Sequence, residues 1–521
     1  MSTYNLADLL ELLAEAGPDR PALVAGDVRH TYGELNARAS KVGHHLAAQG
    51  VQPGEHVAIL AWNRAEWLEA FFGIYKVRAV PIPVNYRYVA GELHHVLSDS
   101  QAVALIGERS LLERVDQDAL PHLRHVVILE DGGTNEVAGV GYEEAIRDQP
   151  ETNDFPARSN DDRYIMYTGG TTGYPKGVEW RSEDIFFGAM GGGNVLGDPI
   201  TSPEEIRANA EASPMCALDC APVMHGAGQW VALMSLFSGA QVVLYTNHNF
   251  DPAEALGILA REKANVIMVV GDVMARPLAA ELAKGGHDTS SLFAIASGGA
   301  PLTEHAKDAL KEHLPFAMFL DNYGASETGA CGPSVGGKEG TARFQMKPGI
   351  TVLDDDLKPV QPGEIGKLAR SGHIPIGYFN DPAKSATTFF TDADGVRWSV
   401  PGDFASLEHD GTIVLLGRGS LMINTGGEKV YPEEVEVAIK DHPGVYDVVV
   451  VGLPDERFGQ RVAAVVAPVA GFELTLEDIV DHCRDRLAGY KLPRQLQLVT
   501  EVQRTAVGKS DYKWAKSVLG V

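Results

Sequence analysis

A run of glycine, hydroxyl and lysine residues in the first third of the chain has the composition of a phosphate-binding loop. It covers residues 167–178 (YTGGTTGYPKGV) and follows the apolar run 164–167, which predicts a short buried strand. Glycines let backbone N–H groups converge, hydroxyls add donors, and lysine adds a mobile positive charge. Gly173 and Lys176 are separated by two residues, so the G-x-x-x-x-G-K-[ST] pattern is absent. We therefore expect a polyphosphate loop of another kind rather than a surface turn, which needs only one or two such residues.

A second polar motif, residues 319–329 (FLDNYGASETG), reads as a strand that ends in a polar loop. Ligand groups gather at the carboxyl ends of parallel strands. The aromatic ring of Tyr323 is suited to stack on a base, and Glu327 is suited to ligate Mg²⁺. Taken alone, a turn followed by a helix cap is the default interpretation. The segment 297–302 (SGGAPL) is a similar and equally ambiguous strand exit.

Four further features are ambiguous when each is taken singly. His225 stands among small and apolar residues, where a histidine is more often a hydrogen-bonded core residue than a catalyst. Asp403 lies in a predicted turn, where solvation is the simple explanation. The segment Gly426-Gly427-Glu428 fits a hairpin, and Lys509 lies in what reads as an exposed basic loop near the end of the sequence.

Composition and charge narrow the class of protein. The 521 residues are 45% hydrophobic and 22% charged, which is typical of a globular protein with two or more domains. The formal net charge of −26 argues against nucleic-acid binding, which needs clustered Lys and Arg. It does not exclude anionic small ligands, because a local basic site can hold them against the global field.

The cysteines and the N-terminus predict a cytoplasmic protein. Cys216 and Cys220 form C-x-x-x-C, but no second Cys/His pair nearby completes a zinc site. We therefore expect the four cysteines to be free thiols in a reducing compartment. The sequence shows neither a signal-peptide pattern nor an apolar run of membrane-spanning length. It shows no pattern of an oligomer interface either.

The order of predicted elements indicates an α/β fold. Over the first 400 residues, strand-like runs alternate with helical stretches, which implies a largely parallel sheet with helices on its faces. Thr31 and Glu34 have the spacing of a capping box. Residues 186–213 look like a flexible glycine-containing excursion. The strands that we expect within the first 400 residues include 57–60, 126–129, 242–245, 266–270 and 293–296.

A change of pattern near residue 417 predicts a domain boundary. We expect a large domain over 1–417 and a small α+β domain over 422–521, with residues 418–421 between them. Pro432 stands at a first-turn position followed by acidic residues, which favours a helix start. The remaining elements predicted for the small domain are strands 448–451, 462–466 and 496–499 and a helix over 476–487.

Considered together, these motifs and their order resemble the adenylate-forming superfamily. That superfamily includes acyl-CoA synthetases, firefly-type luciferases and the adenylation domains of peptide synthetases. The resemblance runs over nearly the whole chain, and its most specific parts are 167–178, 323–329 and 417–436. It implies a large domain of layered sheets and helices that binds ATP and a carboxylate, and a small mobile domain that supplies the remaining groups.

The resemblance implies a site for ATP and Mg²⁺. By similarity, 168–176 would wrap the β- and γ-phosphates, Glu327 would hold Mg²⁺, and Lys509 would bridge the carboxylate and the α-phosphate. Positive charge at that point suits the meeting of two anions. The residues implied to contact the nucleotide are Thr168, Gly169, Gly170, Thr171, Thr172, Gly173, Lys176, Gly299, Ala300, Pro301, Asp321, Asn322, Tyr323, Gly324, Ser326, Asp403 and Arg418.

The resemblance also implies a second step with CoA as co-substrate. The turn at Gly426, Gly427 and Glu428 would line the pantetheine tunnel, and His225 would help to gate thiol entry. The hinge would be Ser420, where relatives usually carry Asp or Lys, so the bias between the two domain orientations is open. Ser326 replaces the usual Thr and keeps its hydroxyl.

Segments 417–432, 508–516 and 191–205 look like those of actinobacterial CoA ligases for lipid and steroid side-chain carboxylates. An apolar pocket would use Met224, Trp230, Val270 and Met274, with room left by small residues at Gly299, Gly324 and Gly329. The leading hypothesis is an AMP-forming carboxylate–CoA ligase for a hydrophobic acid. The alternatives are transfer to a carrier protein, an aryl carboxylate as substrate, a luciferase-like oxidation and a non-catalytic nucleotide-binding protein.

Overall fold

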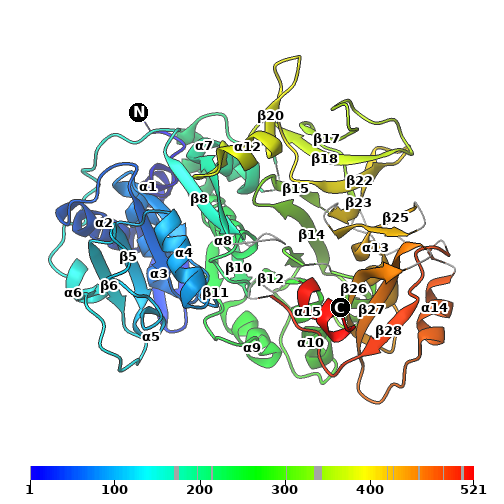
Figure 1. Cartoon of the computed structure of the whole chain (residues 1–521). Coiled ribbons are helices and arrows are strands. Elements are labelled where there is room, and N and C mark those ends of the chain that lie inside the picture. Colours follow the sequence, from blue (N-terminus) through cyan, green and yellow to red (C-terminus); the bar gives the residue numbers. More distant parts are fainter. Residues whose placement is uncertain are drawn as a thin grey trace.

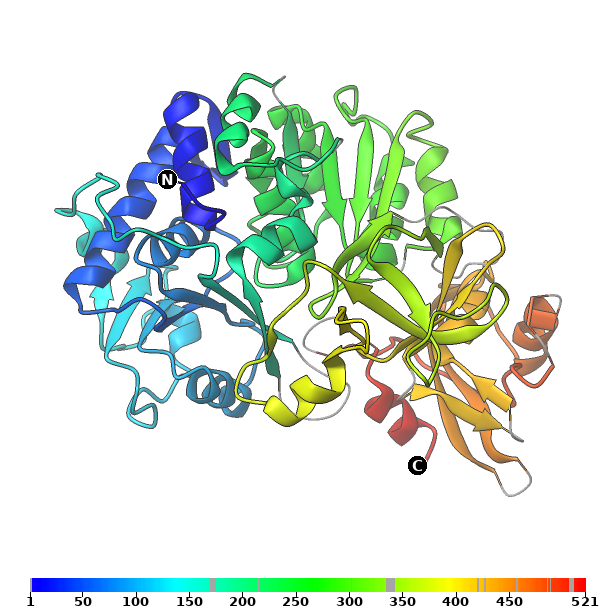
Figure 2. The ribbon, with the colours of Figure 1, turned by 90° about the horizontal axis from the view of Figure 1, so that it is seen from above.

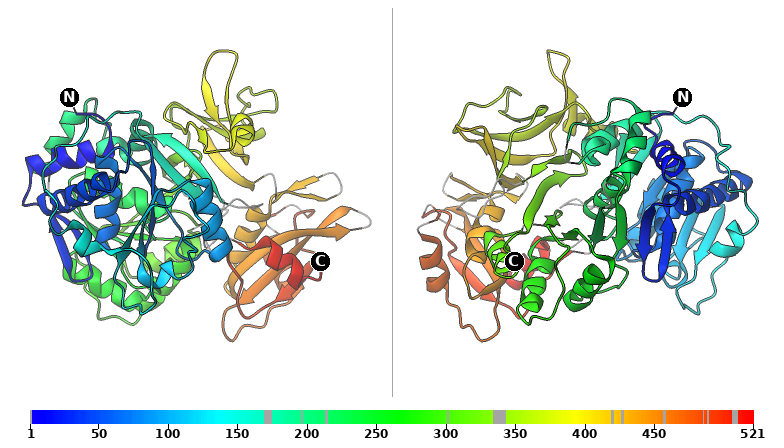
Figure 3. Two further views of the ribbon diagram at one scale, coloured as in Figure 1. Left: turned by 60° about the vertical axis from the view of Figure 1, so that its left-hand side comes forward. Right: turned by 180° about the vertical axis from the view of Figure 1, so that it is seen from behind.

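The computed structural model shows a large domain built from several sheets and a small domain packed at its side (Figure 1). Figure 2 gives the same arrangement from above, and Figure 3 shows that the small domain also lies to one side in views from other directions. The structure describes residues 2–168, 175–195, 197–212, 215–300, 302–333, 343–418, 421–425, 428–455, 458–484, 486–487, 489–505 and 510–521. Over these residues no helix is long and apolar enough to cross a membrane.

The central sheet of the large domain carries most of the predicted site. Its strand order is β15-β14-β13-β12-β10-β11-β1-β2, and the pairs from β14 through to β1 are parallel. The strands are β1 (Pro21–Ala25), β2 (Val28–Thr31), β10 (Cys216–Asp219), β11 (Gln241–Leu244), β12 (Val266–Val269), β13 (Ala294–Ser297), β14 (Met318–Ala325) and β15 (Gly329–Pro333). The helices between them are α8 (Gly226–Phe237), α9 (Pro252–Glu262), α10 (Gly271–Leu282) and α11 (Glu304–Lys311).

A second parallel sheet forms the N-terminal part of the large domain, in the order β4-β3-β5-β6-β7. Its strands are β3 (His56–Leu60), β4 (Val80–Pro83), β5 (Ala104–Glu108), β6 (His125–Leu129) and β7 (Val140–Gly141). The helices of this region are α1 (Leu6–Ala16), α2 (Tyr32–Ala48), α3 (Ala65–Lys76), α4 (Ala90–Asp99), α5 (Arg109–Leu112) and α6 (Tyr142–Ile146). Thr31 and Glu34 form the predicted capping box at the start of α2.

Two smaller sheets complete the large domain. One has the order β19-β9-β8, with β8 (Arg163–Thr168), β9 (Lys176–Arg181) and β19 (Gly377–Tyr378). The other is antiparallel, in the order β16-β23-β22-β18-β21-β20, with β17 beside β18. It contains β16 (Arg343–Gln345), β17 (Ile350–Leu353), β18 (Ile365–Ser371), β20 (Phe389–Thr391), β21 (Arg397–Ser399), β22 (Asp403–Leu407) and β23 (Thr412–Arg418), with α12 (Pro382–Thr388) before β20. The expectation of a largely parallel sheet over the first 400 residues is therefore wrong for β16 to β21, which pair in the antiparallel sense.

The glycine-containing excursion at 186–213 is more regular than predicted. It continues α7 (Ser182–Ala189) into two 3₁₀ segments, η1 (Gly191–Gly193) and η2 (Pro203–Glu211). Asn209 donates from Nδ2 to the carbonyl oxygens of Gly193 at 2.6 Å and Phe237 at 2.7 Å. These bonds tie the described part of the excursion to α8, so it is anchored to the core.

The small domain is α+β, as expected. Its sheet has the order β25-β24-β27-β26, with β28 beside β27. The elements are β24 (Ile423–Thr425), β25 (Glu428–Val430), α13 (Pro432–Lys440), β26 (Val445–Asp455), β27 (Gly459–Pro468), α14 (Leu476–Arg484), β28 (Gln495–Leu498) and α15 (Tyr512–Val518). Pro432 is the first residue of α13, with acidic residues in the first turn. The exact domain boundaries and the hinge at 418–421 stay predictions.

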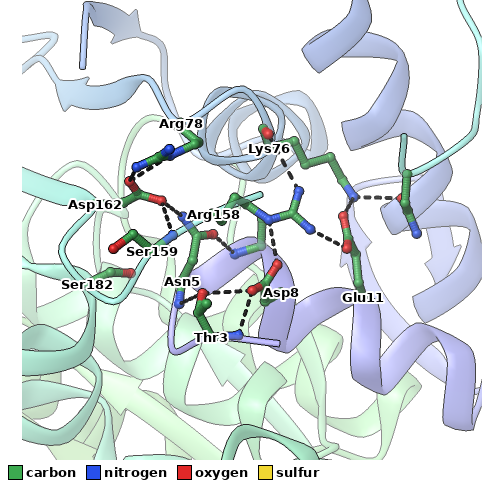
Figure 4. A network of polar contacts seen from close by, with 12 residues as sticks. Thr3, Asn5, Asp8, Glu11, Lys76, Arg78, Arg158, Ser159, Asp162 and Ser182 are labelled. Carbon is green, nitrogen blue, oxygen red and sulfur yellow. Dashed lines mark hydrogen bonds and ion pairs between the residues drawn. The ribbon is translucent and has the colours of Figure 1, made fainter. Parts of the chain in front are cut away.

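A buried network of charges fastens the segment before β8 to the N-terminal helices (Figure 4). Lys76, whose side chain is 0% exposed, pairs with Glu11, and Arg158 binds the same carboxylate. Arg78 and Asp162 form a second ion pair at 2.9 Å. Burial lowers the pKa of Lys76 to about 8, because desolvation disfavours its charged form more than Glu11 favours it. The network thereby fixes the strand that leads into the predicted phosphate loop.

Candidate functional site

Several predicted site residues of the large domain lie at one edge of the central sheet. Because β10, β12, β13 and β14 run parallel, their carboxyl ends share that edge. His225 follows β10, Val270 follows β12, and Gly299 follows β13. Gly299 has φ of +82°, a conformation in which glycine carries no steric cost.

The strand that carries Tyr323 continues further than predicted. β14 runs to Ala325, so Asp321, Asn322, Tyr323 and Gly324 lie in the strand and not in a loop. The physical reason is β15, which pairs with β14 in the antiparallel sense from Asn322 onward and satisfies its backbone groups. Lys307 lies 3.2 Å from the Asp321 carboxylate. Burial raises the pKa of Asp321 and this lysine acts against the rise.

Three residues predicted to contact the nucleoside converge from two sheets. The Tyr323 hydroxyl donates to Asp403 Oδ2 at 2.9 Å, although 80 residues separate them. Asp403 is 6% exposed and is paired in register with Arg418 on the neighbouring strand β23. The Tyr323 ring stacks on Phe344 at a centroid distance of 5.4 Å. The Tyr323 hydroxyl thereby orients the Asp403 carboxylate, whose oxygens can accept hydrogen bonds from the hydroxyl groups of a ligand.

Glu327 follows β14 at the turn into β15. Its Oε1 accepts a hydrogen bond from the Tyr378 hydroxyl at 2.9 Å, and its backbone oxygen accepts one from Ser399 Oγ at 2.6 Å. Over the residues that the structure describes, no cluster of three His, Cys, Asp or Glu is placed to hold a metal. A single oriented carboxylate is still a suitable donor set for Mg²⁺, which keeps several waters and binds through one or two carboxylates plus substrate phosphates.

The two ends of the predicted phosphate loop are brought together by a hairpin. Thr168 on β8 is paired in register with Lys176 on β9. The ammonium group of Lys176 forms an ion pair with Asp381, the N-cap of α12. Lys176 holds the pKa of Asp381 below its usual value through this hydrogen bond. A phosphate that binds Lys176 must therefore compete with Asp381.

The segment with His225 is held by a residue that sequence reasoning missed. Asn63, buried after β3, donates from Nδ2 to the carbonyl oxygens of Ala221 at 3.0 Å and Tyr245 at 3.1 Å. Its Oδ1 accepts from the Val223 N–H at 2.9 Å. His225 itself is the N-cap residue of α8. An asparagine within an apolar stretch carries no signal that points to a partner 158 positions away.

The residues predicted for the acyl pocket fall into four different apolar clusters. Met224 packs in the core of the N-terminal sheet, Trp230 in the core around α1 to α3, and Met274 against the helices behind the central sheet. Val270 instead belongs to a cluster on the α8 side of the central sheet. We call this cluster the α8-side patch; it consists of Ala221, Ala227, Val231, Val266, Met268, Val270, Ala296 and Leu320.

Glycines near this patch serve two different purposes. A Cβ on Gly299 would lie 3.3 Å from the Cβ of Ala227 and 4.0 Å from Val270, so this glycine faces the α8-side patch. A Cβ on Gly324 would lie 2.7 Å from the Gly329 oxygen, and one on Gly329 would lie 2.4 Å from the Gly188 oxygen. The prediction that Gly324 and Gly329 leave room for an acyl group is therefore wrong, because backbone already fills that space.

Several predicted positions lie outside the described residues. They are Gly169, Gly170, Thr171, Thr172, Gly173, Pro301, Ser420, Gly426, Gly427 and Lys509. The strands that flank two of them do pair, since Thr425 on β24 faces Glu428 on β25. The indole of Trp180 donates to the Ser326 carbonyl at 3.0 Å, which fixes the turn that carries Ser326.

The fold is the one found in adenylate-forming enzymes. An anthranilate CoA ligase in complex with anthranoyl-AMP superposes with a TM-score of 0.86 at 27% sequence identity, covering 99% of this chain and 97% of that one. ATP-bound MatB from Rhodopseudomonas palustris has a TM-score of 0.82 at 24% identity, covering 98% of each chain. At that identity the likeness concerns the fold alone.

The sequence assigns the chain to a family within this class. The AMP-binding enzyme family matches residues 10–379, and the AMP-binding enzyme C-terminal domain matches 434–509, so the chain belongs to the AMP-binding enzyme family. It is 42% identical to a 3-oxocholest-4-en-26-oate–CoA ligase of Rhodococcus rhodochrous, over 99% of this chain and 96% of the relative. A medium/long-chain-fatty-acid–CoA/3-oxocholest-4-en-26-oate–CoA ligase of Mycobacterium tuberculosis is 44% identical, over 98% and 95%. A feruloyl-CoA synthase of an Amycolatopsis species is 31% identical, over 95% of each.

Proposed function

We propose that this protein is an ATP-dependent carboxylate–CoA ligase for a hydrophobic fatty or steroid side-chain acid. The observation that carries the proposal is similarity to such ligases over nearly the whole chain, combined with a site edge where hydrogen bonds orient Tyr323, Asp403 and Glu327. In the first step a carboxylate oxygen attacks the α-phosphorus of ATP and pyrophosphate leaves. In the second step the CoA thiolate attacks the acyl carbonyl and AMP leaves.

The assignment of roles follows the chemistry of each step. Asp403 and Arg418 would bind the ribose, Glu327 would hold Mg²⁺, and Lys509 would meet the carboxylate and the α-phosphate. Magnesium supplies charge neutralisation that makes pyrophosphate a better leaving group. The acyl adenylate is an anhydride that water destroys, so the site must exclude solvent until thiol arrives. His225, at the amino end of α8, gates that arrival.

The acyl group is proposed to lie against the α8-side patch. Ala227, Val231 and Val270 are partly exposed at the same sheet edge as Tyr323, and Gly299 faces them without a side chain. Small residues over an apolar surface favour a bulky hydrocarbon. We also expect the enzyme to act in the reducing cytoplasm, since its four cysteines are free thiols, and to be a homodimer, which light scattering tests.

The test is pyrophosphate release with acetate, hexanoate, palmitate, benzoate, ferulate and a steroid side-chain acid, with and without CoA. Products are identified by mass spectrometry. Acyl-CoA from palmitate or the steroid acid supports the proposal. Preference for acetate over every longer acid refutes the hydrophobic substrate, and preference for benzoate or ferulate assigns an aryl substrate. Acyl adenylate without thioester assigns the acceptor to a carrier protein instead of CoA.

A further inference from the structure

Asp272 and Arg276, on one face of α10, connect the segment after β13, where Gly299 and Ala300 are predicted to contact the nucleotide, to the small domain. Asp272 is 3% exposed and accepts hydrogen bonds from the Thr303 N–H at 2.8 Å and the Thr303 hydroxyl at 2.9 Å. Thr303 follows the strand exit at Gly299 and Ala300. Arg276 Nε donates to Asp272 Oδ2 at 3.0 Å. The guanidinium is therefore held in one direction by a carboxylate that is itself fixed.

The other side of Arg276 is bound entirely by the small domain. Its Nη1 donates to the carbonyl oxygens of Val445 at 3.0 Å and Tyr446 at 3.2 Å, and its Nη2 to that of Lys440 at 3.3 Å. Lys440 is the last residue of α13, where helix carbonyls lack intrahelical partners and carry partial negative charge. A cation at this point therefore docks the end of α13 onto α10.

A chain of ion pairs continues from this contact to the segment that carries Lys509. Lys440 Nζ lies 3.7 Å from Asp272 Oδ2 and 3.3 Å from Asp447 Oδ1. Asp447 accepts a hydrogen bond from Arg504 Nε at 3.2 Å. Burial acts to raise the pKa of Asp447, but Lys440 and Arg504 hold it below its usual value, so the carboxylate is ionised.

Arg504 also closes the base of the Lys509 segment. Its backbone forms an isolated antiparallel bridge with Ser510, and its Nη1 donates to Ser510 Oγ at 3.0 Å. Residues 505–509 lie between these two positions in the sequence. The contacts therefore run without interruption from α10 of the large domain, through Lys440 and Asp447, to the two residues that bracket Lys509.

We propose that Asp272 and Arg276 are positioning residues for adenylation, which hold the small domain in the orientation seen in this structure. The inference rests on the proposed two-step ligase function. These residues touch neither substrate nor nucleotide in this scheme. They act by favouring one orientation of the small domain, and the thioester step, which uses another orientation, does not need them.

The experiment measures the two half-reactions separately for full-length Arg276→Ala and Lys440→Gln. Adenylation is followed as pyrophosphate release in the first turnover, and thioester formation as acyl-CoA from supplied acyl adenylate. We expect Arg276→Ala to slow adenylation by about tenfold, which corresponds to about 1.4 kcal/mol. Thioester formation stays within about twofold, and the KM for ATP is unchanged because its proposed contacts lie elsewhere. Arg276→Lys keeps the charge and restores part of the rate.

The control is Arg29→Ala, which removes an arginine bonded to Glu262 at 2.9 Å within the large domain. It should change neither half-reaction. Because Arg276 and Lys440 belong to one contact, their double variant should lose less than the sum of the single losses. Equal losses in both half-reactions at unchanged melting temperature, a loss confined to the thioester step, or no loss would each overturn the inference. A wild-type enzyme that makes no acyl-CoA contradicts the proposed function instead, so the two failures are distinguishable.

Discussion

Replacing Tyr323 by Phe tests whether Asp403 is a nucleotide ligand. The change removes one hydroxyl and keeps the ring that stacks on Phe344 at 5.4 Å. The lost bond is a 2.9 Å donation to a carboxylate that is 6% exposed. Hydrogen bonds to charged groups contribute about 1.5–3 kcal/mol. Water replaces part of the lost hydrogen bond, so we expect ATP binding to weaken by about 1.4 kcal/mol. This loss corresponds to a rise of about tenfold in the KM for ATP.

The assay is steady-state acyl-CoA formation with ATP, the acid and CoA each varied in turn. Only the KM for ATP should rise, and the loss should shrink with 2′-deoxy-ATP if Asp403 binds that hydroxyl. Tyr245→Phe is the matched control, because the Tyr245 hydroxyl donates to the Asn249 carbonyl at 3.1 Å in another part of the large domain. An unchanged KM for ATP in a folded Tyr323→Phe enzyme, or equal rises for ATP and for the acid, would refute the reasoning.

Three further substitutions probe other parts of the molecule. Asp381→Asn keeps the α12 cap but releases Lys176, so the KM for ATP should fall by about two- to fivefold, the range of an exposed ion pair; a rise would show that Asp381 helps the site. Lys509→Ala should abolish adenylation yet leave thioester formation from supplied acyl adenylate largely intact, and equal loss of both would contradict the assigned role. Lys76→Met should lower the free energy of unfolding by about 3 kcal/mol in urea titrations. Since folding lowers the pKa of Lys76 from 10.5 to about 8, the unfolded chain binds more protons between these values, and the wild-type advantage should grow with pH there; a flat difference would contradict this.

The apolar strands could be predicted because their composition alone determines them. The predicted strand 57–60 corresponds to β3 (His56–Leu60), and 448–451 lies within β26. A short apolar run that is rich in β-branched residues and bounded by turn residues fits few structures other than a buried strand. The antiparallel sheet over 343–418 escaped prediction because its strands are short and only partly buried. β18, for example, begins with the exposed Ile365 and alternates irregularly. Such a pattern does not distinguish a strand from a loop.

The motifs identified which residues to examine but not which of them meet. Tyr323 and Asp403 were both singled out, yet nothing in either segment indicates their 2.9 Å contact. Gly324 was misread for the same reason, because a glycine required by close backbone approach looks identical in sequence to one that leaves space. Asn63 and Arg276 were missed altogether, since each acts through backbone carbonyls, which every residue possesses.

The contact between the two domains differs in kind from the cores on either side of it. In the part of the chain that the structure describes, each apolar cluster lies wholly within one domain. The described contacts across the boundary include the ring pair of Phe404 and Tyr431, the close approach of Gly417 on β23 to Glu433 on α13, and the polar contacts of Arg276 and Lys440. Polar contacts of this kind exchange for water at small net cost, whereas apolar burial does not. In the proposed two-step scheme the small domain changes orientation between the steps. An interface whose contacts are largely polar suits that change, because a few charged residues can favour one orientation over the other.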